Sequence, residues 1–77
     1  MFQKESRLNV VDNFGFRHSM YKNEDGITVA AMRVKMKFRK SGIAEHVETQ
    51  FFVNHKLIHK GLQLSEDQIQ KMILENL

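Results

Sequence analysis

The sequence predicts an α+β fold, in which an antiparallel β-meander of three to four strands carries one C-terminal α-helix packed on one face. Apolar and polar residues alternate with a period of two along two runs in the middle of the chain. Glycine-containing turn signals bound these runs. The C-terminal segment changes to the period of an amphipathic helix, which lies after all the strands.

The length and composition of the chain limit what it can build. It has 77 residues, of which 42% are hydrophobic, and it contains no cysteine. A chain of this length buries only roughly 60 to 65% of the surface that its unfolded form exposes, so we expect residues 1–77 to form a single small domain with a thin core. The hydrophobic fraction is too high for a disordered tail, and the absence of cysteine excludes a disulfide and a thiolate metal site. No signal peptide or apolar run of membrane-spanning length is present, so we expect a cytoplasmic protein without membrane contact.

Four strands and one helix are expected, and a strong turn signal at residues 23–26 follows the second strand. The expected elements are strands at about residues 6–11, 14–22, 27–40 and 43–58, and a helix at about residues 66–77. A three-residue loop that ends at Gly26 joins the second and third strands. This loop places Phe16 opposite Val34 and Phe14 opposite Met36, so we expect both phenylalanines in the core.

The third and fourth strands have one apolar and one polar face each. The apolar row of the third strand consists of Ala30, Met32, Val34, Met36 and Phe38. The corresponding row of the fourth strand consists of Val47, Thr49, Phe51, Val53 and Leu57. A two-residue turn at Ser41 and Gly42 pairs these rows, with Met36 opposite Val47. A slip of one residue would place apolar side chains opposite polar ones, so the alternation favours this register.

The C-terminal helix has a complete start signal. Ser65 is the expected N-cap, Gln68 completes a capping box, and Leu64 pairs with Ile69 as a hydrophobic staple. An isolated helix of about three turns is marginal in water, so we expect it to lie across the apolar face of the sheet.

The face of the sheet away from this helix is expected to be basic. Its candidate nucleic-acid-binding residues are Arg17, Arg33, Lys35, Lys37, Arg39, Tyr21 and Phe52. Cations along a sheet neutralise phosphates, and exposed aromatic rings stack on bases. The alternative is a solvated face whose cations are partly balanced by Glu45 and Glu48. The pattern therefore predicts a small protein that binds RNA or single-stranded nucleic acid.

Two resemblances also concern RNA. The segment from Asp12 to Arg17, with aromatic residues around a glycine, is loosely similar to the first RNA-binding motif of cold-shock domains. A longer pattern consists of Met1, Gln3, Glu5, Ser6, Arg7, Leu8, Val10, Asp12, Asn13, Gly15 and Arg17. It resembles the start of the bacterial large-subunit ribosomal protein of the L-fourteen family. The resemblance covers residues 1–17 and implies a small β-barrel associated with RNA, with Arg7 and Arg17 as candidate contacts.

A protein-interaction module is the second interpretation. A thin core and free strand edges suit a small regulator or inhibitor of a larger host enzyme, encoded by a phage or by the host. Such a module would act as a homodimer or by edge-strand pairing, or would bind an acidic protein partner. Val29, Phe52 and Ile58 are expected on the outer face, where they would form an apolar contact.

The sequence offers little for catalysis or metal binding. His55 and His59 lie on an expected strand or just past it, about 13 Å apart along an extended chain, which is too far for one metal ion. The serines have no nucleophile-elbow context, and the glycines are scattered at turns rather than grouped in a phosphate loop. We therefore expect no enzyme activity, no cofactor and no metal.

Overall fold

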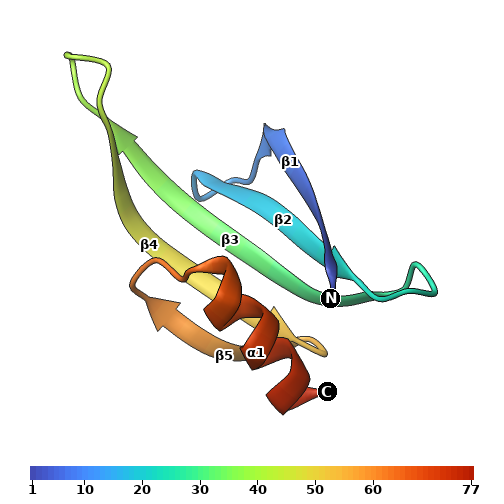
Figure 1. The fold of residues 1–77 in the computed structure, drawn as a ribbon. Coiled ribbons are helices and arrows are strands. Elements are labelled where there is room, and N and C mark those ends of the chain that lie inside the picture. Colours follow the sequence, from blue (N-terminus) through green and yellow to red (C-terminus); the bar gives the residue numbers. More distant parts are fainter.

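The computed structural model describes the backbone of the whole chain and the side chains of residues 1–6 and 11–77. Its elements are β1 (Gln3–Val11), β2 (Phe16–Lys22), β3 (Thr28–Phe38), β4 (Ala44–Val53), β5 (Lys56–Gly61) and α1 (Glu66–Asn76). The strands form one antiparallel sheet in the order β1-β2-β3-β4-β5, and α1 lies on one face of it (Figure 1). The predicted α+β meander is confirmed, with five strands instead of three or four.

The fifth strand follows a turn that lies inside the expected strand at residues 43–58. The expected strand at residues 43–58 ends at Val53, and the chain reverses through Asn54 and His55, whose φ angles are 50° and 64°. Two consecutive residues with positive φ make the tight turn that matches the twist of a hairpin. Lys56 then pairs with Val53, and β5 forms the edge of the sheet beside β4.

The hairpin of β3 and β4 keeps most of the predicted register. The confirmed pairs are Ala30 with Val53, Met32 with Phe51, Arg33 with Gln50, Val34 with Thr49 and Lys35 with Glu48. The turn has three residues instead of two, because the Arg39 amide donates to the Ile43 carbonyl at 2.9 Å. A bulge at Val47 absorbs the difference, so Met36 pairs with His46 and the predicted pair with Val47 is wrong.

A second bulge changes the faces of β2. The predicted turn is present, since the Asn23 amide donates to the Ile27 carbonyl at 3.0 Å. The register then shifts by one residue beyond Lys22 and Thr28, leaving Val29 as the extra residue of β3. A shift of one residue moves every side chain of a strand to the other face relative to its neighbour.

The shifted register overturns the expected positions of Phe16, Arg17 and Tyr21. Phe16 lies opposite Lys35 instead of Val34, on the face away from α1, which we call the outer face. Arg17 lies opposite Val34 and Tyr21 opposite Ala30, so both belong to the face that carries α1, which we call the helix face. Val29 and Ile58, expected on the outer face, pack against the core.

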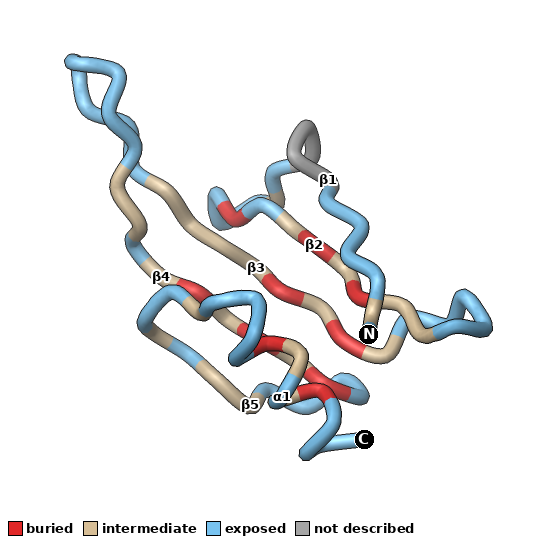
Figure 2. Tube along the Cα trace, viewed as in Figure 1, coloured by how far each residue is buried: buried red, intermediate tan, exposed pale blue. Residues whose placement is uncertain are grey.

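The core lies between α1 and the sheet. Its buried members are Tyr21, Ala30, Met32, Phe51, Val53, Ile69 and Ile73, which Figure 2 shows as buried stretches of the strands and α1. The rings of Tyr21 and Phe51 meet edge to face, with centroids 6.0 Å apart. Burial of these large apolar side chains is the main stabilising contribution available to so small a fold.

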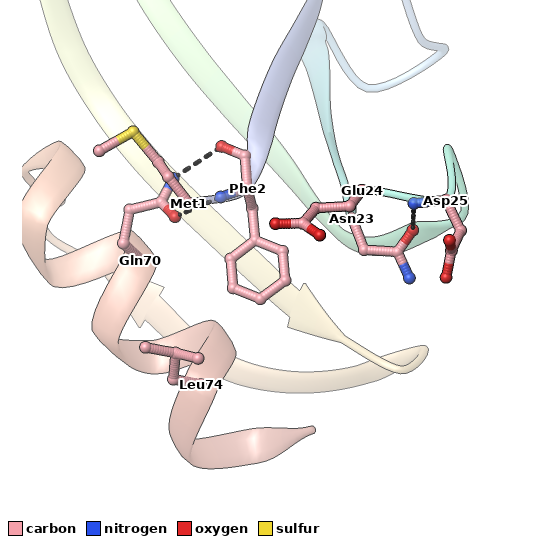
Figure 3. Close-up of a pocket in the computed structure, with 7 residues that line it drawn as sticks. All are labelled: Met1, Phe2, Asn23, Glu24, Asp25, Gln70 and Leu74. Atoms are coloured by element: carbon pink, nitrogen blue, oxygen red, sulfur yellow. Dashed lines mark hydrogen bonds between the residues drawn. The ribbon is translucent and has the colours of Figure 1, made fainter.

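The start of α1 is as predicted. The Gln68 amide donates to Ser65 Oγ at 3.2 Å, and the Ser65 amide donates to Gln68 Oε1 at 2.9 Å, which completes the capping box. The helix is also fastened to the N-terminus, because Gln70 makes two hydrogen bonds with the backbone of Phe2, at 2.8 and 3.0 Å (Figure 3).

The helix covers only part of the helix face. α1 has 11 residues and is about 16 Å long, whereas β3, also with 11 residues, is about 36 Å long. The hairpin of β3 and β4 therefore extends well beyond α1 (Figure 1). On this extension Val34 and Met36 are half-buried and Phe38 is 61% exposed. An apolar row thus continues past the end of the core.

Candidate nucleic-acid interface

The outer face carries a groove of about 530 Å³ that crosses the middle of the sheet. Its lining residues, which we call the outer groove, are Phe14, Phe16, Arg33, Lys35, Val47, Glu48 and Gln50. They come from β2 and the loop before it, from β3 and from β4. Two aromatic rings, two cations, an amide and a carboxylate therefore meet on one surface.

Asp12 builds the loop that presents Phe14. Its Oδ1 accepts hydrogen bonds from the amides of Phe14 and Phe16, at 2.9 and 3.0 Å. Gly15 supplies the positive φ of 85° that lets the chain turn back into β2. The expected strand at residues 14–22 thus begins at Phe16, and Phe14 is 72% exposed in the loop instead of lying in the core.

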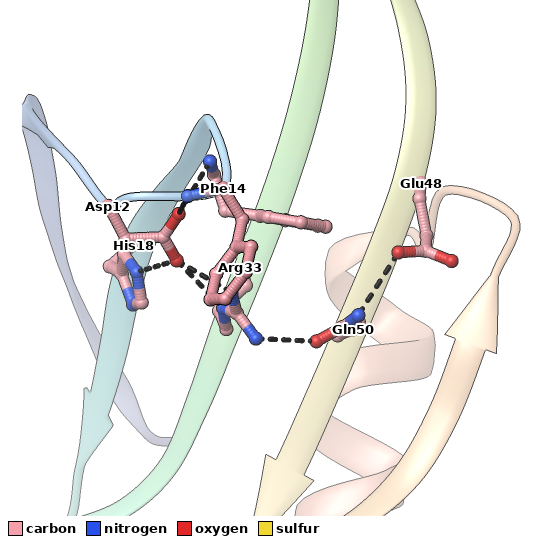
Figure 4. A network of polar contacts seen from close by, with 7 residues as sticks. Asp12, Phe14, His18, Arg33, Glu48 and Gln50 are labelled. Atoms are coloured by element: carbon pink, nitrogen blue, oxygen red, sulfur yellow. Dashed lines mark hydrogen bonds and ion pairs between the residues drawn. The ribbon is translucent and has the colours of Figure 1, made fainter.

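The other carboxylate oxygen of Asp12 fixes Arg33. Oδ2 accepts from Arg33 Nη2 at 2.6 Å and from Arg33 Nε at 3.1 Å, and it also contacts His18 Nε2 at 3.0 Å (Figure 4). Held in this way, the guanidinium carbon lies 4.4 Å from the ring centre of Phe16 and 6.0 Å from that of Phe14. The bulge-shifted register thus stacks a cation on an aromatic ring.

The hydrogen bonds of Asp12 determine its charge. Desolvation acts to raise the pKa of Asp12, but the amides of Phe16 and Phe14, the Arg33 guanidinium and His18 together outweigh it and hold the pKa well below its ordinary value. Asp12 is therefore a carboxylate throughout the physiological pH range, which keeps the guanidinium in place.

A chain of polar contacts runs from Arg33 across β4. Arg33 Nη1 donates to Gln50 Oε1 at 2.8 Å, and Gln50 Nε2 donates to Glu48 Oε2 at 3.0 Å (Figure 4). These contacts fix which end of the amide of Gln50 faces β3 and orient the carboxylate of Glu48 at the far wall of the groove.

The predicted cations divide into paired and unpaired ones. Arg33 is neutralised by Asp12, and Arg39 pairs with Glu45 at 2.5 Å. Lys35 and Lys37 form no ion pair with any side chain that the structure describes, and Lys35 Nζ lies 5.9 Å from the ring centre of Phe16. The free positive charge of the outer face is therefore smaller than the sequence predicts and lies on two lysines of β3.

The remaining predicted residues fall in different places. Tyr21 is fully buried under α1, where burial and the neighbouring Glu66 carboxylate, which accepts from its hydroxyl at 3.1 Å, raise its pKa. Arg17 lies on the helix face and lines a separate groove there of about 280 Å³. Phe52 is on the outer face, opposite Ala31 and Leu57, and is half-buried. Leu57 was expected on the other face.

Sequence reasoning missed Asp12, Phe14 and Phe16 as members of this surface. The signal was the cold-shock-like segment at residues 12–17, whose aspartate and glycine form the turn. The side chain of Arg7, implied as an RNA contact by the ribosomal resemblance, lies outside the described residues.

A second cavity differs in its chemistry. It encloses about 450 Å³ between the N-terminus, α1 and the loop after β2 (Figure 3). The charged side chains of its lining belong to Glu24 and Asp25, both carboxylates. Such a lining repels phosphate, so the outer groove is the better candidate for a polyanion.

The described part of the chain contains neither a candidate metal site nor a helix that could span a membrane. In residues 1–6 and 11–77, no group of three or more histidine, aspartate or glutamate side chains is arranged to hold a metal ion. His59 instead contacts the Leu62 carbonyl through Nε2 at 2.7 Å. Within the described part of the chain, α1 is too short and too polar to cross a membrane.

Comparison of the chain with protein families, with curated proteins and with solved structures gives no match.

Proposed function

We propose that this chain binds single-stranded nucleic acid, RNA or DNA, in the outer groove. The observation that carries the proposal is the exposed ring of Phe14 beside the fixed guanidinium of Arg33, with the unpaired Lys35 and Lys37 along the same strand. Exposed aromatic rings and neighbouring cations are the two features that sequence-tolerant single-strand binders share.

Each of these residues has a distinct role in the proposal. A base stacks on Phe14, because an exposed ring offers a π-face to any of the bases. Lys35 and Lys37 contact phosphates, since neither ammonium is committed to a described carboxylate. Arg33 is committed to Asp12 and Gln50, so it acts as a fixed planar surface next to the base. The two RNA-related resemblances of residues 1–17 agree with this class of ligand.

Fluorescence anisotropy with a labelled mixed-sequence 12-nucleotide strand, in RNA and DNA forms, tests the proposal. Two phosphate contacts predict that the logarithm of the association constant falls with the logarithm of salt concentration with a slope of about −1.4. A mixed-sequence duplex of the same length should bind more weakly, because its bases are not free to stack on Phe14. A flat salt response, or no binding at low salt, would contradict the proposal.

A homodimer is the second candidate function. It is favoured by Met36 and Phe38, which continue the apolar row of Val34 along a groove on the helix face, Phe38 being 61% exposed. Oligomerisation is a common way to supplement a core as thin as this one. Sedimentation velocity between micromolar and millimolar protein tests it. A dimer that dissociates in Phe38→Glu supports this function, whereas a monomer at all concentrations contradicts it.

A further inference from the structure

The far wall of the outer groove carries a carboxylate, which a surface built only for phosphate would exclude. Glu48 lines the groove together with Lys35, and its side chain is 27% exposed. A carboxylate repels phosphate oxygens but accepts hydrogen bonds from donors on a base edge. The groove therefore has a feature that general attraction to nucleic acid does not explain.

The position of this carboxylate is well defined. Glu48 Oε2 accepts from Gln50 Nε2 at 3.0 Å, and the amide of Gln50 is itself held by Arg33 at 2.8 Å. Among the side chains that the structure describes, Glu48 Oε1 has one long contact, with Lys60 Nζ at 3.9 Å. Since each carboxylate oxygen has two lone pairs, both oxygens retain capacity to accept hydrogen bonds from a ligand.

The width of the groove suits one base. Phe14 precedes β2 and Glu48 lies on β4, and two strand spacings separate β2 from β4 by about 10 Å. Between them, β3 contributes Lys35 to the same groove. A base that stacks on Phe14 can thus present its edge to a carboxylate and an ammonium at once.

We infer that the outer groove prefers guanine, an inference that rests on the proposed binding of single strands. The Watson–Crick edge of guanine presents two adjacent donors, N1–H and the N2 amino group, followed by the O6 acceptor. The two donors match the two oxygens of Glu48, and O6 matches the ammonium of Lys35. Adenine and cytosine each offer one exocyclic amino donor beside an unprotonated ring nitrogen, and uracil offers one N–H between two acceptors.

Anisotropy titrations with four 9-nucleotide RNA strands test the inference. Each strand is oligouridine, with guanine, inosine, adenine or uracil at the central position. Guanine is expected to strengthen binding over uracil by roughly 5- to 150-fold, the range of one good bidentate pair. Inosine lacks the N2 amino group and should fall between the two.

Two carboxylate variants provide the matched comparison. Glu48→Gln should abolish the guanine preference while retaining affinity for oligouridine, because it keeps the size of the side chain and removes the charged acceptor. Glu45→Gln changes an outer-face carboxylate that pairs with Arg39 outside the groove, and it should preserve the preference. Circular dichroism confirms that both variants are folded.

The outcomes separate this inference from the proposed function. Salt-dependent binding with equal affinity for all four strands overturns the guanine preference and leaves single-strand binding in place. A guanine preference that survives Glu48→Gln also overturns the inference, because another group must then read the base. Absence of binding to every strand overturns the proposed function together with the inference.

Discussion

The two faces of the sheet each carry a pair of aromatic residues, and the pairs are used in opposite ways. On the helix face, Tyr21 and Phe51 are fully buried under α1, edge to face. On the outer face, Phe16 lies under the guanidinium of Arg33 and Phe14 is exposed beside it. The pair on the helix face is closed by α1 and stabilises the fold. In the open pair on the outer face, Phe16 is 7% exposed beneath the cation, and the ring of Phe14 is the one available to a ligand.

The polar partners of the two pairs show the same contrast. The hydroxyl of Tyr21 donates to Glu66, so the buried pair has no unmet hydrogen bond. The outer pair is organised by Asp12, which fixes both the loop of Phe14 and the guanidinium of Arg33. Substitutions in the first pair should therefore change stability, and substitution of the exposed Phe14 should change binding.

The largest expected effect comes from opening the closed pair. Phe51→Ala removes a fully buried ring, and such substitutions cost about 3 to 5 kcal/mol of unfolding free energy. In a domain with so thin a core this loss is expected to leave little folded protein at 25 °C. Urea denaturation followed by circular dichroism measures it. A variant that stays as stable as the original chain would show that the helix face is not the main source of stability.

Removing the exposed ring of the open pair should separate binding from stability. Phe14→Ala is expected to weaken single-strand binding by about 5- to 150-fold, equivalent to the ~1 to 3 kcal/mol of one stacked base. The stability should change by less than about 0.5 kcal/mol, since the ring is exposed. Phe38→Ala is the matched control, because Phe38 is 61% exposed on the opposite face. Equal losses of affinity in both variants would contradict the assignment of the outer groove.

The carboxylate that organises the open pair should give stability a dependence on acid pH. The pKa of Asp12 in the folded chain lies below its ordinary value of 3.8, so its contribution is fully present above that value and is lost as the pH falls below it. Asp12→Asn should therefore be less stable than the original chain at pH 7, with a difference that shrinks below about pH 4.

Urea denaturation at pH 7, 5, 4 and 3 follows this difference. Asp25→Asn is the control, since Asp25 is an exposed carboxylate of the turn at residues 23–26. A difference between the original chain and Asp12→Asn that stays constant down to pH 3 would show that the charge of Asp12 does not stabilise the fold.

The hydroxyl of the closed pair should give a smaller effect, at alkaline pH. The pKa of Tyr21 is raised above its ordinary value of 10, so its contribution is fully present below pH 10 and is lost as the pH rises further. Tyr21→Phe removes one hydrogen bond, at a cost of about 0.5 to 1.5 kcal/mol at pH 7. It should also lose less stability than the original chain between pH 10 and 11, as urea denaturation at the two values would show. An identical alkaline loss in both proteins would contradict this role.

The smallest expected effect concerns one phosphate contact. Lys37→Gln should reduce the salt slope of single-strand binding by about 0.7 and change stability little. Lys71→Gln removes a charge from α1, where the lysine lies 3.9 Å from Glu75, and should leave the slope unchanged. Anisotropy across a salt series compares the two, and equal slopes for both variants would exclude Lys37 as a phosphate contact.

The alternation of apolar residues predicts strand pairing well but does not predict bulges. The pairs from Ala30 with Val53 to Lys35 with Glu48 follow from it, because a slip of one residue would place apolar side chains opposite polar ones. The bulge at Val29 leaves no mark in the amino-acid composition of either strand. It nevertheless moves both Arg17 and Tyr21 from the expected outer face to the helix face. The turn at residues 54–55 escaped prediction because it contains no glycine.

The candidate site was predictable only in part for the same reason. Arg33, Lys35 and Lys37 follow from the basic row of one strand, and they lie on the outer face as predicted. The contacts of Asp12 with Arg33 join residues 21 positions apart. They depend on the register of β2 against β3, which the bulge sets. Phe14 was assigned to the core because the expected strand was extended through Gly15, whereas β2 begins at Phe16.

An NMR titration tests the central claim most directly, because it reports on both faces of the sheet in one experiment. Single-stranded RNA is added to the ¹⁵N-labelled chain, and amide and aromatic shifts are followed. We predict that the changes concentrate at Phe14, Phe16, Arg33, Lys35 and Gln50, and that those of the core beneath α1 stay small. Changes centred on the helix-face row of Val34, Met36 and Phe38, or no changes at low salt, would contradict binding in the outer groove.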